Sequence, residues 1–187
     1  MHDSTLNLSP LDCPPVHTFK RRESIPLKKN ILWQIRTGSA RLFTIAEDGS
    51  VITLGFWGVG DLTGHPLACV EPCQLECLTH VEAVALTTNQ CWNLNQVMLN
   101  HICQMQELIR MRHGHILQRL HLLLNWLASK FGSFTEQGYL IQLRLTHQQI
   151  AEAICTSRVT VTRLIQKLER SDVIRYSGQQ CIILRHC

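Results

Sequence analysis

Two short helical segments near the C-terminus constrain the fold of this chain more than any other feature. The first opens with Thr146 as helix N-cap and Gln149 three residues later, which is the spacing of a capping box. A short polar turn follows, and Thr156 or Ser157 caps a second helix that continues to about Arg170. The apolar residues expected to face inward from the second helix are Val161, Leu164, Ile165 and Leu168.

Two short helices joined by a tight turn, the second opening with Arg and Thr residues, form a helix-turn-helix arrangement. Because early residues of the second helix enter the major groove, we expect Arg158 and Arg163 to contact guanine and Val159 to pack on a thymine methyl group. At the start of the first helix we expect Thr146, His147 and Gln148 to contact phosphates, and further along the second helix Lys167 is the candidate phosphate contact. Ser157 and Thr160 are further candidate contacts. The alternative is a plain helical hairpin with solvated arginines.

Two β-prone runs follow the second helix. Residues 173–176 and 181–184 flank the polar segment Ser177-Gly178-Gln179-Gln180. This pattern predicts a β-hairpin, which would be the wing of a winged helix-turn-helix.

Residues 16–92 show short β-rich runs separated by turns. The turn at 47–50 contains Asp48-Gly49, a pair that tolerates positive φ and favours a hairpin. Several strands at close spacing predict a small β-sandwich or β-roll. The expected strands are 31–35, 40–46, 51–56 and 81–86.

The hydrophobic pattern becomes helical from Leu94 onward. One stripe recurs at spacings of four, four, three and four, and residues 116–127 carry a broader apolar face. The stripe is either a core face or a dimerisation seam, and we favour the seam. Its residues are Leu94, Met98, Ile102, Met105 and Ile109. The expected organisation is a lead-in at 1–15, a β-domain at 16–92, a dimerisation helix region at 93–128 and a DNA-binding domain at 129–187.

Charge is distributed unevenly along the chain. Residues 42–109 contain no Lys or Arg and seven acidic residues, whereas residues 110–187 contain eleven Lys or Arg and four acidic residues. A basic C-terminal part joined to an acidic middle suggests that one end meets a polyanion such as double-stranded DNA. No apolar run approaches the roughly 20 residues of a membrane span, and the first residues lack a signal-peptide pattern. We therefore expect a cytoplasmic protein, without membrane partners.

The helix-turn-helix segment resembles the C-terminal signature of the CRP/FNR family of bacterial transcription regulators. The similar runs are Leu145-Thr-His-Gln-Gln-Ile-Ala-Glu-Ala-Ile154 and Ser157-Arg-Val-Thr-Val-Thr-Arg163. Within the family the chain most resembles the cyanobacterial global nitrogen regulators, which share Val159 where the wider family often has Glu. The resemblance implies an α+β fold with a shortened, cyclic-nucleotide-binding-like β-roll, a long dimerisation helix and a C-terminal winged helix-turn-helix. It also implies a homodimer on a palindrome with TGTA-type half-sites, with RNA polymerase as a further partner.

One departure from the family concerns the effector. Relatives that bind cyclic nucleotides hold the phosphate with an Arg in the roll, and the nitrogen regulators use Arg for the carboxylates of 2-oxoglutarate. The corresponding stretch here, about residues 60–86, contains no Arg or Lys. Because a buried anion without a cationic partner is costly, we expect neither ligand to bind in the family's way.

The nine cysteines leave three interpretations open. Thiolates can bind an iron–sulfur cluster or zinc, and Cys69, Cys73 and Cys77 are the candidate ligands. The same thiols could form a redox switch, or they could be small buried hydrophobic side chains. The family's oxygen sensors place their cysteines near the N-terminus, where this chain has only Cys13. We expect no bound cofactor.

Haem in the roll is a further interpretation of the sensor, whereas a protein-interaction adaptor and a catalytic metalloprotein are the two functions that compete with DNA-binding regulation. Histidines such as His65, His80, His113 and His115 could serve a haem-binding roll, although lone histidines are more often surface or core residues. A protein-interaction adaptor with weak DNA contact is the alternative to a regulator. Zinc-hydrolase motifs and nucleophile–base spacings are missing from the sequence, so we expect no enzyme.

Overall fold

The N-terminal part of the chain forms two antiparallel sheets that face each other. The structure is a computed structural model, and it describes residues 14–68, 70–90, 93–176 and 182–185. The sheets have strand orders β1-β8-β3-β6 and β2-β7-β4-β5. Their strands are β1 (Val16–Phe19), β2 (Ser24–Ile25), β3 (Ile31–Thr37), β4 (Ala40–Ile45), β5 (Val51–Trp57), β6 (Leu62–Thr63), β7 (Cys73–Cys77) and β8 (Val81–Thr87), with short 3-10 turns η1 (His65–Leu67) and η2 (Thr88–Gln90).

The inner faces of the two sheets enclose one apolar core. Trp33 and Ile35 of β3, Leu42 of β4, Leu75 of β7 and Val81 of β8 meet in one apolar core between the sheets. The predicted turn at 47–50 joins β4 to β5, with Gly49 at φ 80°. The expected β-roll is therefore confirmed, and the four predicted strands end within about two residues of their expected positions.

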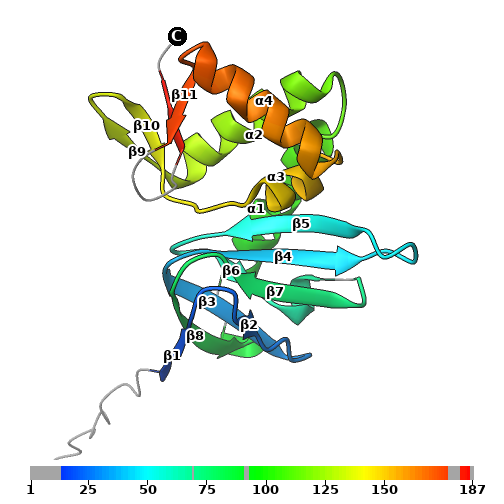
Figure 1. Cartoon of the computed structure of the whole chain (residues 1–187). Coiled ribbons are helices and arrows are strands. Elements are labelled where there is room, and N and C mark those ends of the chain that lie inside the picture. The colour runs from blue at the N-terminus through cyan, green and yellow to red at the C-terminus, as the bar shows by residue number, and fades with distance from the viewer. Residues whose placement is uncertain (1–13, 69, 91–92, 177–181, 186–187) are drawn as a thin grey trace, which may run out of the picture.

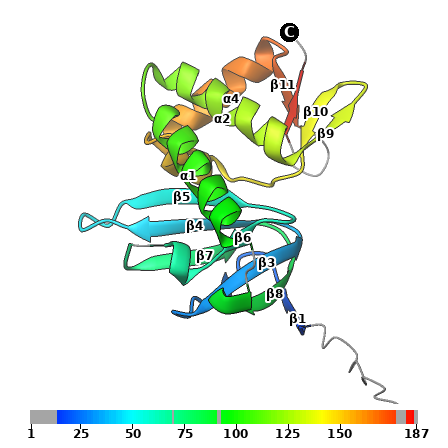
Figure 2. The same cartoon turned by 180° about the vertical axis from the view of Figure 1, so that it is seen from behind.

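Two helices connect the roll to the C-terminal domain. Helix α1 (Leu94–Arg110) packs on β5 and buries Gln104 and Leu108. It crosses the back of the roll in Figure 2. A tight turn containing Gly114, at φ 88°, leads into α2 (Ile116–Phe131).

Helix α2 packs with the C-terminal domain. Its buried leucines share one apolar core with Ile150 and Ile165 of the later helices; these leucines are Leu120, Leu123, Leu124 and Leu127. We therefore propose that the dimerisation helix ends at the turn 111–115, earlier than the predicted 128. Helix α1 itself is 17 residues long.

The C-terminal domain is a winged helix-turn-helix. Its helices are α3 (His147–Ala153) and α4 (Arg158–Arg170), and its sheet has the order β11-β12-β10-β9. The strands are β9 (Gly132–Thr135), β10 (Gly138–Ile141), β11 (Ile174–Tyr176) and β12 (Ile182–Leu184). The predicted wing hairpin is present as β11 and β12, and its turn lies outside the described residues. The β9–β10 hairpin was not predicted.

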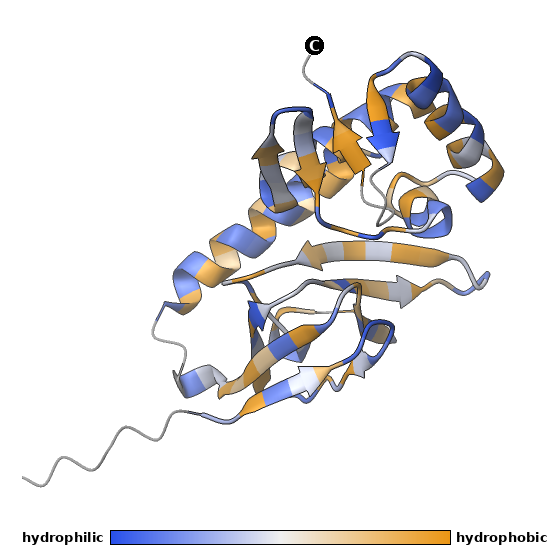
Figure 3. Ribbon diagram, turned by 60° about the vertical axis from the view of Figure 1, so that its left-hand side comes forward, coloured by the Kyte–Doolittle hydropathy of each residue, from blue (hydrophilic) through white to orange (hydrophobic). Residues whose placement is uncertain are grey.

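The two domains contact each other directly. Phe56 of β5 and Leu78 of the roll lie in the same apolar core as α2, α3 and α4. In Figure 1 the helix-turn-helix lies directly above β5. Hydrophobic residues are concentrated in the strands and recur in bands along the helices (Figure 3). Among the described helices, none is long and apolar enough to cross a membrane.

Candidate nucleic-acid interface

The first helix of the motif begins as the sequence predicts. The Thr146 side chain accepts a hydrogen bond from the Gln149 backbone amide at 3.1 Å, and the Gln149 side chain accepts one from the Thr146 amide at 2.9 Å. This capping box satisfies two amides that would otherwise lack partners at the start of α3. Thr146 and Gln148 are exposed, although the Gln148 amide already donates to Glu152.

The turn between the helices places Cys155 in the left-handed region, at φ 53°. Ser157 is the N-cap of α4, and its hydroxyl accepts from the Thr160 amide at 3.2 Å. Val161, Ile165 and Leu168 are buried against the domain core, as predicted, while Leu164 is half-buried. The opposite face of α4 is therefore free of the core.

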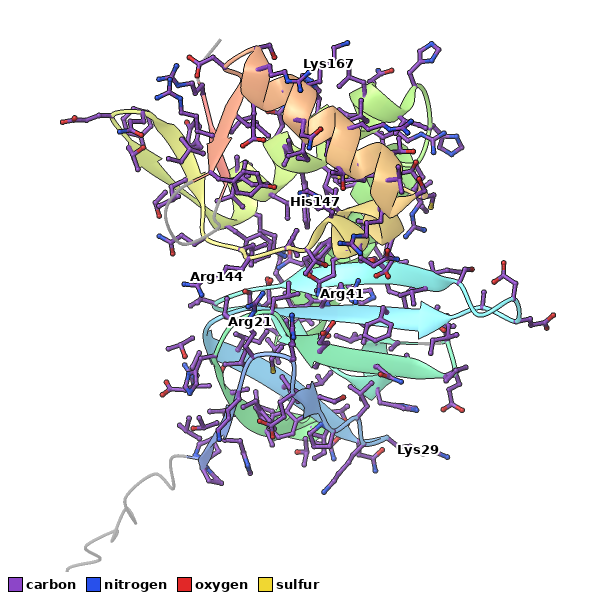
Figure 4. The ribbon with its side chains drawn as sticks, in the orientation of Figure 1. Arg21, Lys29, Arg41, Arg144, His147 and Lys167 are labelled. Carbon is purple, nitrogen blue, oxygen red and sulfur yellow. The ribbon has the colours of Figure 1, made fainter. Side chains whose placement is uncertain are left out.

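The exposed face of α4 carries the residues predicted to read DNA. Arg158, Arg163 and Lys167 are exposed, and Val159 is 60% exposed although it is apolar. Val159, Arg163, Gln166 and Arg170 follow one another at spacings of four, three and four, so they lie on one face of the helix. Gln166 and Arg170 were not predicted. Helical spacing from Val159 and Arg163 is the sequence signal that identifies Gln166 and Arg170. Figure 4 shows Lys167 pointing away from the roll.

His147 was expected to contact phosphate, but the structure gives its ring an internal role. Nδ1 lies 2.8 Å from the Thr162 hydroxyl and Nε2 lies 3.1 Å from the Tyr176 hydroxyl. Since the Thr162 hydroxyl donates to the Arg158 carbonyl, it accepts from Nδ1–H, which leaves Nε2 to accept from Tyr176. The neutral ring thus joins the start of α3, the recognition helix and the wing. Burial raises the pKa of Tyr176 to about 12, which keeps its hydroxyl protonated.

This arrangement predicts that the folded state loses stability as the pH is lowered. Burial, and then the charge of Arg158, lowers the pKa of His147 from its usual value. Because the pKa of His147 is lower in the folded state than the unfolded value of about 6.5, the neutral ring favours the folded state at pH values above 6.5. This stabilisation is lost as the pH falls below 6.5 and through the folded-state pKa. We expect the thermal unfolding midpoint to drop between pH 7.5 and 5.5, and to drop less in His147→Gln. Burial also lowers the pKa of His101, but the wild-type protein and His147→Gln both contain His101, so it contributes equally to the two midpoints. An equal drop in both proteins would show that the His147 ring does not contribute.

The predicted dimerisation stripe lies on the uncovered side of α1. Met98, Ile102 and Ile109 are 46%, 49% and 53% exposed, and Leu94 and Met105 are half-buried. Leu99, which was not predicted, is 55% exposed on the neighbouring surface. The face of α1 that contacts the roll is instead formed by Gln104, Leu108 and His101, whose ring stacks on Trp57 at 5.0 Å.

Of the candidate metal ligands, the two that the structure describes, Cys73 and Cys77, do not converge. Cys73 and Cys77 lie at the two ends of β7, about 13 Å apart at the rise of a strand, which is too far for both to bind one ion. Burial raises the pKa of the Cys77 thiol to about 12, which disfavours the thiolate. Cys69 and Cys13 lie outside the described residues. His65 contacts Glu71 at 3.0 Å, and His113 and His115 are exposed.

A β-roll, a helix with an uncovered apolar stripe and a winged helix-turn-helix with an exposed, basic second helix together define a DNA-binding transcription regulator. The chain belongs to the CRP/FNR family of such regulators. Residues 118–186 match the family model described as a Crp-like helix-turn-helix domain.

Relatives along most of the chain support this assignment. The Regulatory protein CysR of Synechococcus elongatus is 37% identical over 87% of this chain and 81% of its own length. A Global nitrogen regulator of Nostoc is 30% identical over 86% of this chain and 81% of its own length. Among solved structures, a CRP-family transcriptional regulator from Thermus thermophilus has the same fold, with a TM-score of 0.76, 21% identity and coverage of 91% of this chain and 92% of that one.

Proposed function

We propose that this protein is a sequence-specific regulator that binds, as a homodimer, a palindrome with TGTA-type half-sites. The observation that carries the proposal is the uncovered face of α4, where Val159 is 60% exposed between basic residues. An apolar side chain in such a place is not covered by the described part of its own chain. A thymine methyl group in the major groove would cover it, and the neighbouring Arg158 and Arg163 would donate to guanine.

The control of DNA binding is proposed to differ from that of relatives that use an anionic effector. The only Arg of strands β4 to β8 is Arg41, and it pairs with carboxylates on the outer face of its sheet. The inner face is filled by an apolar core that includes Trp33 and Trp57. A cyclic nucleotide or a dicarboxylate placed there would find no cationic partner from residues 42–109.

Fluorescence anisotropy tests this proposal directly. Purified protein would be titrated, in reducing buffer at stated salt and without added ligand, against a palindromic TGTA-type duplex and a scrambled duplex of equal length. We expect tighter binding to the palindrome, with both affinities falling as salt rises. Equal affinity for the two duplexes would contradict the proposed sequence specificity, and binding that appeared only after a cyclic nucleotide or 2-oxoglutarate was added would contradict the proposed difference in control.

Arg158→Ala is expected to remove discrimination at one base position. Loss of a bidentate contact should weaken binding to the palindrome by about 1–3 kcal/mol. Weak, non-specific binding to the scrambled duplex should remain. The matched control is Lys167→Ala, which also removes one exposed cation from α4 but should mainly lower the salt dependence. If Arg158→Ala kept the full preference for the palindrome, the role assigned to this residue would be wrong.

A further inference from the structure

Arg41 lies buried between the roll and the helix-turn-helix. Its side chain is 6% exposed, Nη2 lies 3.0 Å from Glu76 of β7, and Nη1 lies 2.5 Å from Glu152 of α3. The guanidinium also lies over the Phe43 ring at 4.7 Å. In Figure 4 Arg41 is located at the boundary between β4 and the helices above it. A buried ion pair therefore joins β4 of the roll to the first helix of the DNA-binding motif.

Further hydrogen bonds follow the same boundary. Gln149 of α3 donates to Glu76 at 3.5 Å. Arg112, in the turn after α1, donates to the Thr53 carbonyl of β5 and to the Ala153 carbonyl at the end of α3. At the other edge Arg21 donates to the carbonyls of Leu78 and Arg144, at 3.1 Å each. Directional polar contacts thus border the apolar core that the two domains share.

The docked arrangement leaves the DNA-facing residues exposed, although Gln148 and Ser157 line a cleft together with residues 49–52 of the β4–β5 hairpin. Thr146, Gln148, Ser157, Arg158 and Arg163 are all exposed while Glu152 is held by Arg41. The contact with the roll therefore does not cover the surface that would meet DNA.

The need for a fixed orientation follows from the geometry of the target. A dimer on a palindrome must present two recognition helices about 34 Å apart. The covalent link from α1 to α2 is a short turn at Gly114, and the apolar contact of Phe56 with Trp126, at 6.1 Å between ring centroids, has little directional preference. A charge-assisted hydrogen bond to a carboxylate has a defined geometry.

We propose that Arg41 is a positioning residue for DNA recognition, acting through Glu152 to set the orientation of the helix-turn-helix relative to the dimer helix. This inference rests on the proposed function. When one DNA-binding domain of the dimer is bound, the second domain then has a high effective concentration at its own half-site, because its orientation is already fixed.

The test is Glu152→Ala, which removes the ion pair to α3 and the Gln148–Glu152 hydrogen bond but leaves Arg41 paired with Glu76. Three duplexes would be compared by anisotropy: the palindrome, the palindrome with one extra base pair between half-sites, and a single half-site. For the palindrome we expect a loss of affinity of about fivefold or more, and for the half-site a change below about twofold. The preference for native spacing should fall by a similar factor.

The matched control is Glu136→Ala, which removes one exposed carboxylate from the β9–β10 turn of the same domain. It accounts for the general gain in affinity when a negative charge is lost. A Glu152→Ala protein that lost affinity equally for all three duplexes would show a merely structural role and overturn the proposal. Tighter binding to the palindrome than in the control would mean that the contact is inhibitory, which also overturns it.

A measurement without DNA separates this inference from the proposed function. Hydrogen exchange followed by mass spectrometry should be faster in Glu152→Ala over residues 51–57 and 147–153, which form the contact, and unchanged over β3 and β8. If the wild-type protein showed no sequence preference, the proposed function would fail while this measurement still decided the role of Arg41. Unchanged exchange at the contact would overturn that role.

Discussion

Arg41→Met is expected to lower the free energy of unfolding by about 3–5 kcal/mol, because it leaves two carboxylates facing each other without a cation. The side chains of Glu76 and Glu152 are only 23% and 11% exposed, so water compensates poorly for the lost charge. Methionine approximates the aliphatic part of Arg41, so lost packing contributes little. Chemical denaturation followed by tryptophan fluorescence would measure the change.

The physical reason can be separated from general damage by a second variant. In Arg41→Met/Glu76→Gln/Glu152→Gln all three charges are removed, and stability should recover most of the loss, since replacing a whole buried ion group is often neutral. Arg36→Met, at an exposed position of β3, is the control and should change stability by less than about 0.5 kcal/mol. A triple variant as unstable as Arg41→Met would show that the carboxylates are not the cause.

Local sequence signals were sufficient for the DNA-binding motif. The Thr146–Gln149 capping box and the Ser157 cap depend on residues three positions apart, and both are present with the expected partners. The inward face of α4 follows from helical spacing alone. The hairpin at Gly49 was predictable because only a few residue pairs tolerate its backbone geometry.

Contacts between distant segments were not predictable in this way. Arg41 and Glu152 are 111 residues apart, and nothing near either residue indicates the other. His147 reads locally as a phosphate contact, yet its Nε2 partner, Tyr176, lies in the wing, 29 residues away. The separation of Cys73 from Cys77 has a related reason. A spacing of four brings cysteines together on a helix, but on strand β7 it separates them.

The β9–β10 hairpin was missed although its sequence carries a signal. Gly132 and Gly138 bracket the segment, and Gly138 adopts φ 130°. A Cβ at Gly138 would lie 2.2 Å from the Leu184 carbonyl of the neighbouring strand β12. Glycine is required at position 138 because strand β12 approaches its backbone closely, and not because of the turn between β9 and β10.

Ile102→Glu is expected to convert the protein to a monomer and to lower its affinity for the palindromic duplex by about 10²–10⁴-fold, the contribution of a second linked site. Ile102 is 49% exposed at the centre of the stripe formed with Met98 and Ile109. In a dimer packed along this stripe, two glutamates would be buried close together without a cation from residues 42–109. Sedimentation analysis and anisotropy would measure the two effects on one sample.

Gln96→Glu provides the matched control, since it adds the same charge to α1 on an exposed surface away from the stripe, where Gln96 bonds Asn100. It should remain a dimer and keep nearly all of its affinity. Binding of Ile102→Glu to a single half-site should also be close to normal, because the change is far in sequence from α3 and α4 and alters only assembly. If Ile102→Glu remained a dimer with normal affinity for the palindrome, association through the α1 stripe would be wrong. The exposed apolar residues of α1 would then require a different partner.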